Sequence, residues 1–215
     1  MRISSLGNLR QIEDCEIETI RSWRNAPAVR KNMYTTHVIS KEEHETWWQQ
    51  ARSREDQKHL IYEQNGRSLG VVGFSSISYM NKNCFWAFYA SPDAPRGTGS
   101  KMEFLALEFA FRKLKLHKLS CEVLDFNKAV VKLHRKFGFI VEGTFRQQHR
   151  VGEDYADIIR LGIFKSEWQD RRPLIEEGLT NALGHGKATK IDVRFWQDDW
   201  KININIHDNG TGCNE

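Results

Sequence analysis

Two stretches of the sequence decide its fold: Arg96-Gly97-Thr98-Gly99-Ser100-Lys101 and Asn127-Lys128-Ala129-Val130-Val131-Lys132-Leu133-His134-Arg135-Lys136-Phe137-Gly138-Phe139. The first stretch follows an apolar run that predicts a strand, and it precedes apolar residues at helical spacing from Met102 onward. Glycines at this place let backbone amides approach an anion, and the N terminus of the following helix adds positive potential. The second stretch predicts a helix that ends at Gly138 and leads into another strand.

The glycine-rich stretch at 96–101 can be compared with three kinds of phosphate-binding loop. A dinucleotide-binding fingerprint needs a third glycine where this chain has Met102, and a Walker loop needs Gly-Lys-Ser/Thr, which is missing here. The pyrophosphate loop of acetyl-CoA enzymes has the pattern Gln/Arg-x-x-Gly-x-Gly/Ala. Arg96 and Gly99 fit its first part, whereas Lys101 replaces the last small residue. A plain glycine-rich turn is the alternative that the loop alone leaves open.

Taken together and in this order, the two stretches resemble the GNAT acetyltransferase family, whose second signature is an asparagine, an apolar helix and then Leu-Tyr-x-x-x-Gly-Phe. The resemblance covers residues 1 to about 168. It implies an α/β fold with a mixed central sheet, flanking helices and two splayed parallel strands that receive the pantetheine arm of acetyl-CoA. It also implies an enzyme in which a substrate amine attacks the thioester directly, a backbone amide stabilises the oxyanion, and an acid protonates the leaving thiolate.

Local signals agree with this architecture. Asn65-Gly66 between two apolar runs predicts a β-hairpin, and Ser40-Lys41-Glu42-Glu43 predicts the start of a helix. Strands and helices are mixed along the chain, which favours a mixed α/β sheet.

The resemblance implies roles for residues of both stretches. His134 stands where the family places a tyrosine acid, and a histidine can donate a proton near neutral pH. The alternative is that His134 only covers part of the acetyl-CoA channel, while water protonates the thiolate. Lys101 could add a phosphate contact. The residues expected to bind the co-substrate acetyl-CoA are Phe88, Ala90, Arg96, Gly97, Thr98, Gly99, Ser100, Lys101, Asn127 and Lys136.

The first sixty residues carry the pattern that bears on the acceptor. It includes Trp23-Arg24-Asn25, the run from Val29 to Thr35, and Glu43-His44 followed by Trp47-Trp48. This pattern resembles the acetyltransferases of pseudaminic acid biosynthesis, which acetylate the 4-amino group of UDP-4-amino-4,6-dideoxy-N-acetyl-β-L-altrosamine. The resemblance implies a small UDP-linked amino sugar as the acceptor. The residues expected to bind this sugar are Arg24, Met33, Tyr34, His44, Trp47, Ser75 and Tyr89.

Other readings of the same residues stay open. Related family members acetylate polyamines or protein N termini. A polyamine site would need clustered carboxylates, such as those of Glu42, Glu43 and Glu45, which equally fit a helix cap and a solvated surface. Trp47 could be a core residue, and Arg24 could be a surface ion-pair partner. A non-enzymatic acyl-CoA-binding module is the remaining alternative, and the intact loop argues against it.

The composition excludes several other classes of protein. The chain has 215 residues, with 32 Lys and Arg against 28 Asp and Glu, and its net charge of +4 is too small to require a nucleic-acid partner. No apolar run approaches the roughly 20 residues of a membrane helix, and the N terminus lacks a hydrophobic signal core. The four cysteines form no CxxC pair, so no metal site is expected. We expect a soluble, cytoplasmic protein without a membrane partner that could form a homodimer.

The sequence changes in character after residue 168, and we predict a boundary there. Residues 1–168 are expected to form the acetyltransferase domain, 169–173 a junction, and 174–215 a separate partial α/β fragment. The fragment resembles the N box and the first glycine box of sensor histidine-kinase ATPase domains. The residues that carry this resemblance are Glu177 to Leu183, His185-Gly186-Lys187 and Asp208-Asn209-Gly210-Thr211-Gly212. The chain stops before the ATP lid, so we expect this fragment to be non-functional.

Overall fold

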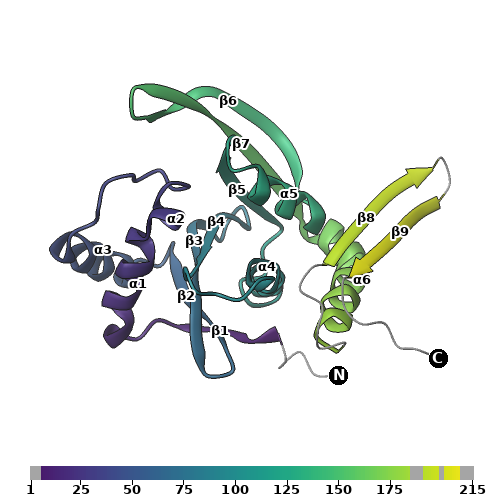
Figure 1. Cartoon of the computed structure of the whole chain (residues 1–215), viewed down its shortest axis with the longest axis horizontal. Helices are drawn as coiled ribbons and strands as arrows, with labels where there is room; N and C mark the ends of the chain where they lie inside the picture. Colours follow the sequence, from purple (N-terminus) through teal and green to yellow (C-terminus); the bar gives the residue numbers. More distant parts are fainter. Residues whose placement is uncertain (1–5, 185–190, 199–200, 209–215) are drawn as a thin grey trace.

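A seven-stranded mixed sheet forms the centre of the molecule (Figure 1). The computed structural model describes residues 6–184, 191–198 and 201–208. The strand order is β1-β2-β3-β4-β5-β7-β6, so the mixed α/β sheet predicted from the sequence is confirmed. The strands are β1 (Asn8–Gln11), β2 (Lys58–Gln64), β3 (Arg67–Ser78), β4 (Asn83–Ala90), β5 (Lys118–Leu124), β6 (Ile140–Val151) and β7 (Asp154–Phe164).

Helices cover both faces of this sheet. Neighbouring residues of a strand point to opposite faces: Val71 packs in a cluster with Ile20 and Trp48, whereas Val72 packs in the main core with Met102. The first cluster joins the sheet to α1 and α3, and the second joins it to α4 (Figure 1). The helices are η2 (Asp14–Glu16), α1 (Ile17–Asn25), α2 (Pro27–Arg30), α3 (Lys41–Ser53), α4 (Thr98–Glu108), its π-helical continuation η3 (Phe109–Lys113), α5 (Lys128–Phe137) and α6 (Lys165–Gly184).

The local signals of the sequence appear where they were predicted. Asn65 and Gly66 join β2 to β3 with φ values of 52° and 72°, the left-handed pair that a tight hairpin turn requires. Ser40 caps α3, and its hydroxyl accepts a hydrogen bond from the Glu43 N–H at 3.1 Å. Gly138 ends α5 with a φ of 104°.

Helix α6 runs without a break through residues 169–173, where the sequence predicted a junction. Its buried residues Trp168, Ile175 and Leu179 belong to the main core cluster. Glu108 of α4 also accepts hydrogen bonds from the Trp168 indole at 3.0 Å and from Arg172 at 2.9 Å. The helix therefore continues through residues 169–173 because contacts with the sheet domain lie both before and after them, from Trp168 to Leu179.

The remaining described residues form a separate antiparallel pair, β8 (Ile191–Asp198) with β9 (Lys201–Asp208). Glu177 and Asn181 of the predicted ATPase-like boxes lie on α6, whereas His185-Gly186-Lys187 and Asn209-Gly210-Thr211-Gly212 fall outside the described residues. Among the described residues, no helix combines the length and the apolar character needed to cross a membrane.

Candidate active site

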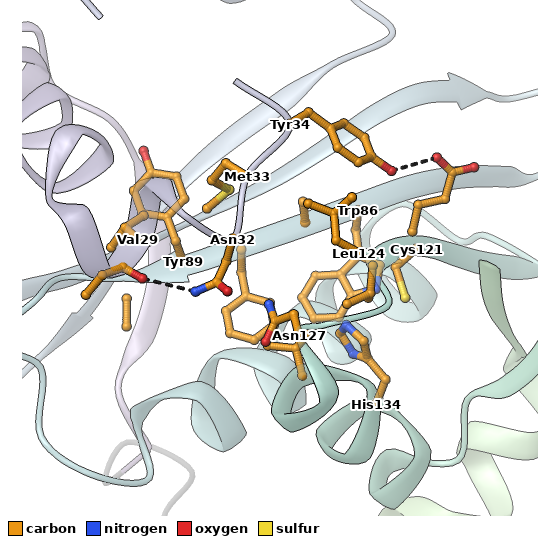
Figure 2. A pocket seen from close by; sticks show the side chains of 17 residues that line it. Val29, Asn32, Met33, Tyr34, Trp86, Tyr89, Cys121, Leu124, Asn127 and His134 are labelled. Carbon is orange, nitrogen blue, oxygen red and sulfur yellow. Dashed lines mark hydrogen bonds between the residues drawn. The ribbon is translucent and has the colours of Figure 1, made fainter. Parts of the chain in front are cut away.

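Strands β4 and β5 separate after a short parallel contact, and the separation opens a cavity. Their pairing runs from Asn83 with Lys118 to Phe85 with Ser120. From Trp86 to Ala90, β4 still pairs with β3 but no longer with β5. This edge borders a cavity of about 300 Å³, which we call the wedge cavity (Figure 2). An extended ligand can add to such an unpaired edge as a strand would, so the splayed strands predicted from the sequence are present.

The glycine-rich loop leads into α4 beside the wedge cavity. Gly97 caps the helix with a φ of +85°, and the Thr98 hydroxyl donates to the Pro95 carbonyl at 2.7 Å. A Cβ atom at Gly99 would lie 3.5 Å from the side chains of Phe88 and Leu133, so the first turn of α4 lies against the wedge wall. The dipole and the N–H groups at the start of an 11-residue helix favour a bound anion.

Four other residues predicted to bind acetyl-CoA surround this loop and cavity. Arg96 is exposed and Ser100 half-buried at the helix start, while Ala90 and Asn127 line the wedge cavity. These four residues therefore lie at the N terminus of α4 or along the wall of the wedge cavity.

Lys101 departs from the family pattern and has a defined partner. Its ammonium group donates to the Gln64 side-chain oxygen at 3.1 Å, and burial lowers the pKa of Lys101. Lys136, the other lysine of the predicted set, is half-buried on α5. The phosphate contact of Lys101 stays a prediction, because this side chain is turned to the end of β2.

His134 reaches the wedge cavity from α5 and is 3% exposed (Figure 2). Its ring packs on the apolar wall, with the Trp86 ring centroid 5.4 Å away. Its Nδ1 atom lies 2.8 Å from Oε1 of Glu103, a glutamate of α4 with an exposed fraction of 0%. Burial raises the pKa of Glu103. With Nδ1 held by Glu103, the Nε2 atom is the one available to a ligand.

A second cavity, of about 320 Å³, lies between the strands β2 to β4 and the helices α1 and α3; we call it the side cavity. Arg24, Met33, His44, Trp47 and Tyr89 line it, so five of the seven predicted acceptor residues are brought together. The two cavities adjoin, because four residues line both: Met33, Ala87, Phe88 and Tyr89.

Two polar groups of the side cavity lack a hydrogen-bond partner among the described residues. Arg24 donates through Nη2 to the Thr35 carbonyl at 3.3 Å, but its buried Nη1 has no partner. The buried Nδ1 of His44 also has none. Burial lowers the pKa of Arg24 and of His44. Buried polar atoms usually have partners in proteins, so these two atoms are exceptional among the described residues that line the side cavity.

The other two predicted acceptor residues lie elsewhere. Tyr34 lines the wedge cavity, and its hydroxyl donates to Glu122 at 3.1 Å (Figure 2). Ser75 is half-buried on β3, paired with Phe85, and lines neither the wedge nor the side cavity. Tyr34 therefore joins the loop after α2 to β5, while the role of Ser75 in binding the acceptor stays a prediction.

Three residues were not singled out from the sequence: Glu103, which contacts His134, and Glu122 and His59, which line the cavities. Glu103 stands in an apolar helix, and a charged residue at a core position was the available signal. Glu122 accepts hydrogen bonds from Tyr34 and, at 3.3 Å, from Arg160. His59 lines the side cavity, and burial lowers its pKa to about 4. Glu122 lies on β5 and His59 on β2. The pairing of these strands brings both residues to the cavities, and no local sequence motif indicates this placement.

Comparisons with known proteins agree with this geometry. Residues 8–140 match the family model described as "Acetyltransferase (GNAT) domain". The chain is 29% identical over 136 residues to acetyltransferase PseH of Campylobacter jejuni, covering 63% of this chain and 84% of the relative. It is 25% identical to spermidine N(1)-acetyltransferase of Escherichia coli over 53% of this chain and 62% of the relative.

A solved structure shares the fold. It is the spermidine N-acetyltransferase of Vibrio cholerae in complex with CoA and spermine, with a TM-score of 0.73, 22% identity, and coverage of 77% of this chain and 99% of that one. The family match spans more than half of the 215 residues, and the splayed strands and helix-capping loop supply the expected acetyl-CoA path. The chain belongs to the GNAT family and is an acetyl-CoA-dependent N-acetyltransferase.

Proposed function

We propose that the acceptor is the 4-amino group of a UDP-linked 4-amino-4,6-dideoxy sugar, with the sugar nucleotide in the side cavity and the thioester of acetyl-CoA in the wedge cavity. The observation that carries this proposal is Arg24. Its buried Nη1 has no partner among the described residues, and it lines the cavity that adjoins the wedge. A guanidinium with a free donor in a desolvated pocket binds a diphosphate through strong charge-assisted hydrogen bonds.

The charge of the side cavity disfavours a polyamine. Among the described residues that line it, Glu43 is the one carboxylate, and both of its oxygens lie 3.0 Å from His37 Nε2. A polycation entering this cavity would also meet the guanidinium of Arg24. Likeness to PseH over 136 residues supports the nucleotide-sugar assignment and a place in pseudaminic acid biosynthesis.

A polyamine such as spermidine is the second candidate. Glu122 supplies a carboxylate in the wedge cavity, next to the side cavity, where an ammonium group could bind. The likeness to spermidine acetyltransferases supports the same candidate. Arg24 thus favours a negatively charged acceptor, whereas Glu122 favours a positively charged one.

Acetyl-CoA, His134 and the backbone of β4 have separate roles in the proposed acetyl transfer. Acetyl-CoA supplies the acetyl group and a thiolate leaving group. As the acceptor nitrogen bonds to the acetyl carbon and the C–S bond breaks, His134 gives its Nε2 proton to sulfur and the nitrogen releases a proton to solvent. Backbone N–H groups of the unpaired edge from Trp86 to Ala90 are the donors available to the oxyanion.

A thiol-release assay tests the proposal directly. The enzyme is given acetyl-CoA with UDP-4-amino-4,6-dideoxy-N-acetyl-β-L-altrosamine, spermidine or an N-terminal peptide in parallel reactions, and each product is identified by mass. The proposal requires the highest kcat/KM with the sugar nucleotide. Faster turnover of spermidine would replace it with the second candidate.

A further inference from the structure

Glu103, which contacts His134, is unusual because it is a glutamate at a fully buried position of a helix. Glu103 is fully buried in the first half of α4, and its second oxygen, Oε2, has no hydrogen-bond partner among the described residues. Buried carboxylates are costly unless they are paired or neutral. Within the described part of the chain, the carboxyl group has one polar contact, the 2.8 Å approach of its Oε1 to His134 Nδ1. A packing role alone does not explain a glutamate here, because the surrounding helix positions are apolar, such as Met102, Phe104 and Leu107.

The charge balance of the site limits how many protons this pair holds. With one proton on Nε2 and one shared between Nδ1 and Oε1, the pair is neutral overall. With Nε2 bare and Nδ1 donating to a carboxylate, it carries a buried negative charge. Burial favours the neutral form, and the raised pKa of Glu103 agrees with it. Either position of the shared proton leaves Nε2–H facing the wedge cavity.

We infer that Glu103 is the positioning residue of the acid: it fixes His134 by Nδ1, keeps Nε2 protonated toward the thioester, and supplies the proton that keeps the imidazole neutral after transfer. This inference rests on the proposed role of His134 as acid. The Nε2 proton passes to the thiolate, the shared proton settles on Nδ1, and Glu103 is left as the carboxylate. Solvent then restores the missing proton.

The other titratable groups around the pair do not replace Glu103. Lys136 of α5 acts on Glu103 by its charge, and Cys121 of β5 has a pKa raised by burial, so this thiol stays protonated. From β4 the ring meets Trp86 and Phe88, and beyond α5 it meets Phe139.

The test compares Glu103→Gln with the wild-type enzyme across pH 6 to 9. Glutamine keeps the shape and one hydrogen bond but holds no spare proton, so transfer would leave an imidazolate unless the ring starts as imidazolium. We expect kcat to fall about 10²-fold at pH 7, within the range of a general acid, with the KM for acetyl-CoA nearly unchanged. The ratio of wild-type to variant kcat should also rise with pH. This ratio cancels the titration of the acceptor amine.

Glu108→Gln on the same helix is the matched control. It keeps an oxygen that can accept from Trp168 but loses the charge that pairs with Arg172 and Arg112, so it should lower the melting temperature without a pH-dependent change in the kcat ratio. A constant kcat ratio for Glu103→Gln at every pH would mean a structural role and would overturn the inference.

A second measurement uses the wild-type protein and no acceptor. Nitrogen-15 NMR of the imidazole, assigned with His134→Gln, should show Nε2 protonated at pH 7. A bare Nε2 with a protonated Nδ1 would overturn the inference, even if the glutamine variant fails to fold. The kinetic ratio is measured with whichever amine is turned over, so a wrong acceptor assignment leaves both readouts intact.

Discussion

Replacing Arg24 by alanine removes the group on which the acceptor assignment depends. In the free enzyme, Arg24 has one 3.3 Å hydrogen bond to the Thr35 carbonyl and a buried nitrogen without a partner among the described residues. In the complex, that nitrogen would bond to the diphosphate. Hydrogen bonds to charged groups contribute about 1.5–3 kcal/mol, which corresponds to a rise of about 10- to 150-fold in the KM for the sugar nucleotide.

The Arg24→Ala change should affect the KM of one substrate and not that of the other. The KM for acetyl-CoA should stay nearly constant, because Arg24 lines the side cavity and not the wedge. Burial lowers the pKa of Arg24, so the folded protein holds this charge at a cost, and the melting temperature should not fall. Steady-state kinetics with each substrate varied in turn measures both KM values.

Arg21→Ala is the matched control, since this arginine lies on the same helix but bonds to Glu18 and the Ile39 carbonyl. It should leave both KM values unchanged. If Arg24→Ala raises the KM for acetyl-CoA instead of the KM for the sugar nucleotide, the division of the two cavities is wrong.

Three further changes give distinct readouts. His134→Phe should lower kcat by 10²–10⁴-fold with little change in either KM, whereas His134→Tyr should retain much activity; kinetics across pH measures both. Deleting 185–215 should leave acetyl transfer intact, whereas deleting 173–215 also removes Ile175 and Leu179 from the core. That second deletion should cost about 3–6 kcal/mol of unfolding free energy, at about 1.5–3 for each side chain, as measured in urea. Burial lowers the pKa of His59 from 6.5 to about 4. As the pH drops, His59 is therefore protonated in the unfolded chain before it is protonated in the folded protein. The free energy of unfolding should fall by up to about 3 kcal/mol between pH 6.5 and pH 4.

Each of these has an outcome that contradicts it. An unchanged kcat and pH profile in His134→Phe would make His134 a channel wall. Equal stability of the two deletion proteins would mean that the second half of α6 contributes nothing to the core. For His59, the free energy of unfolding in urea is measured at pH 7 and at pH 4.5. The difference between the two values should be smaller in His59→Gln than in the wild-type protein. An equal difference would mean that another group causes the effect.

The local elements of the fold could be predicted because their signals are short-range. The Asn65-Gly66 turn and the Ser40 cap each depend on a few neighbouring residues. The continuity of α6 could not be predicted in this way. Pro173 and the charged residues around it suggest a break, but the packing of Ile175 and Leu179 on the sheet domain depends on residues far away in the chain.

The same distinction applies to the site. The loop at 96–101 and His134 lie in contiguous motifs, so their likeness to the family motifs was enough to predict a role for them. The contact of Glu103 with His134 spans 31 positions and arises only when α4 and α5 lie together. Tyr34 was placed with the acceptor residues, yet its hydroxyl contacts Glu122, 88 positions away, on the wedge side. Such pairings depend on the tertiary arrangement, which residue spacing does not encode.

A competition reaction tests the central claim most directly. Equal concentrations of the UDP-linked 4-amino sugar and spermidine are mixed with limiting acetyl-CoA and the full chain, and the two acetylated products are quantified by mass. With a standard of each product for calibration, and with little of either acceptor consumed, their ratio gives the ratio of the two kcat/KM values. Because Nη1 of Arg24 lacks a partner among the described residues, we predict an excess of acetylated sugar nucleotide of about 10- to 150-fold, the size of one charge-assisted hydrogen bond. An excess of acetylspermidine would contradict the account.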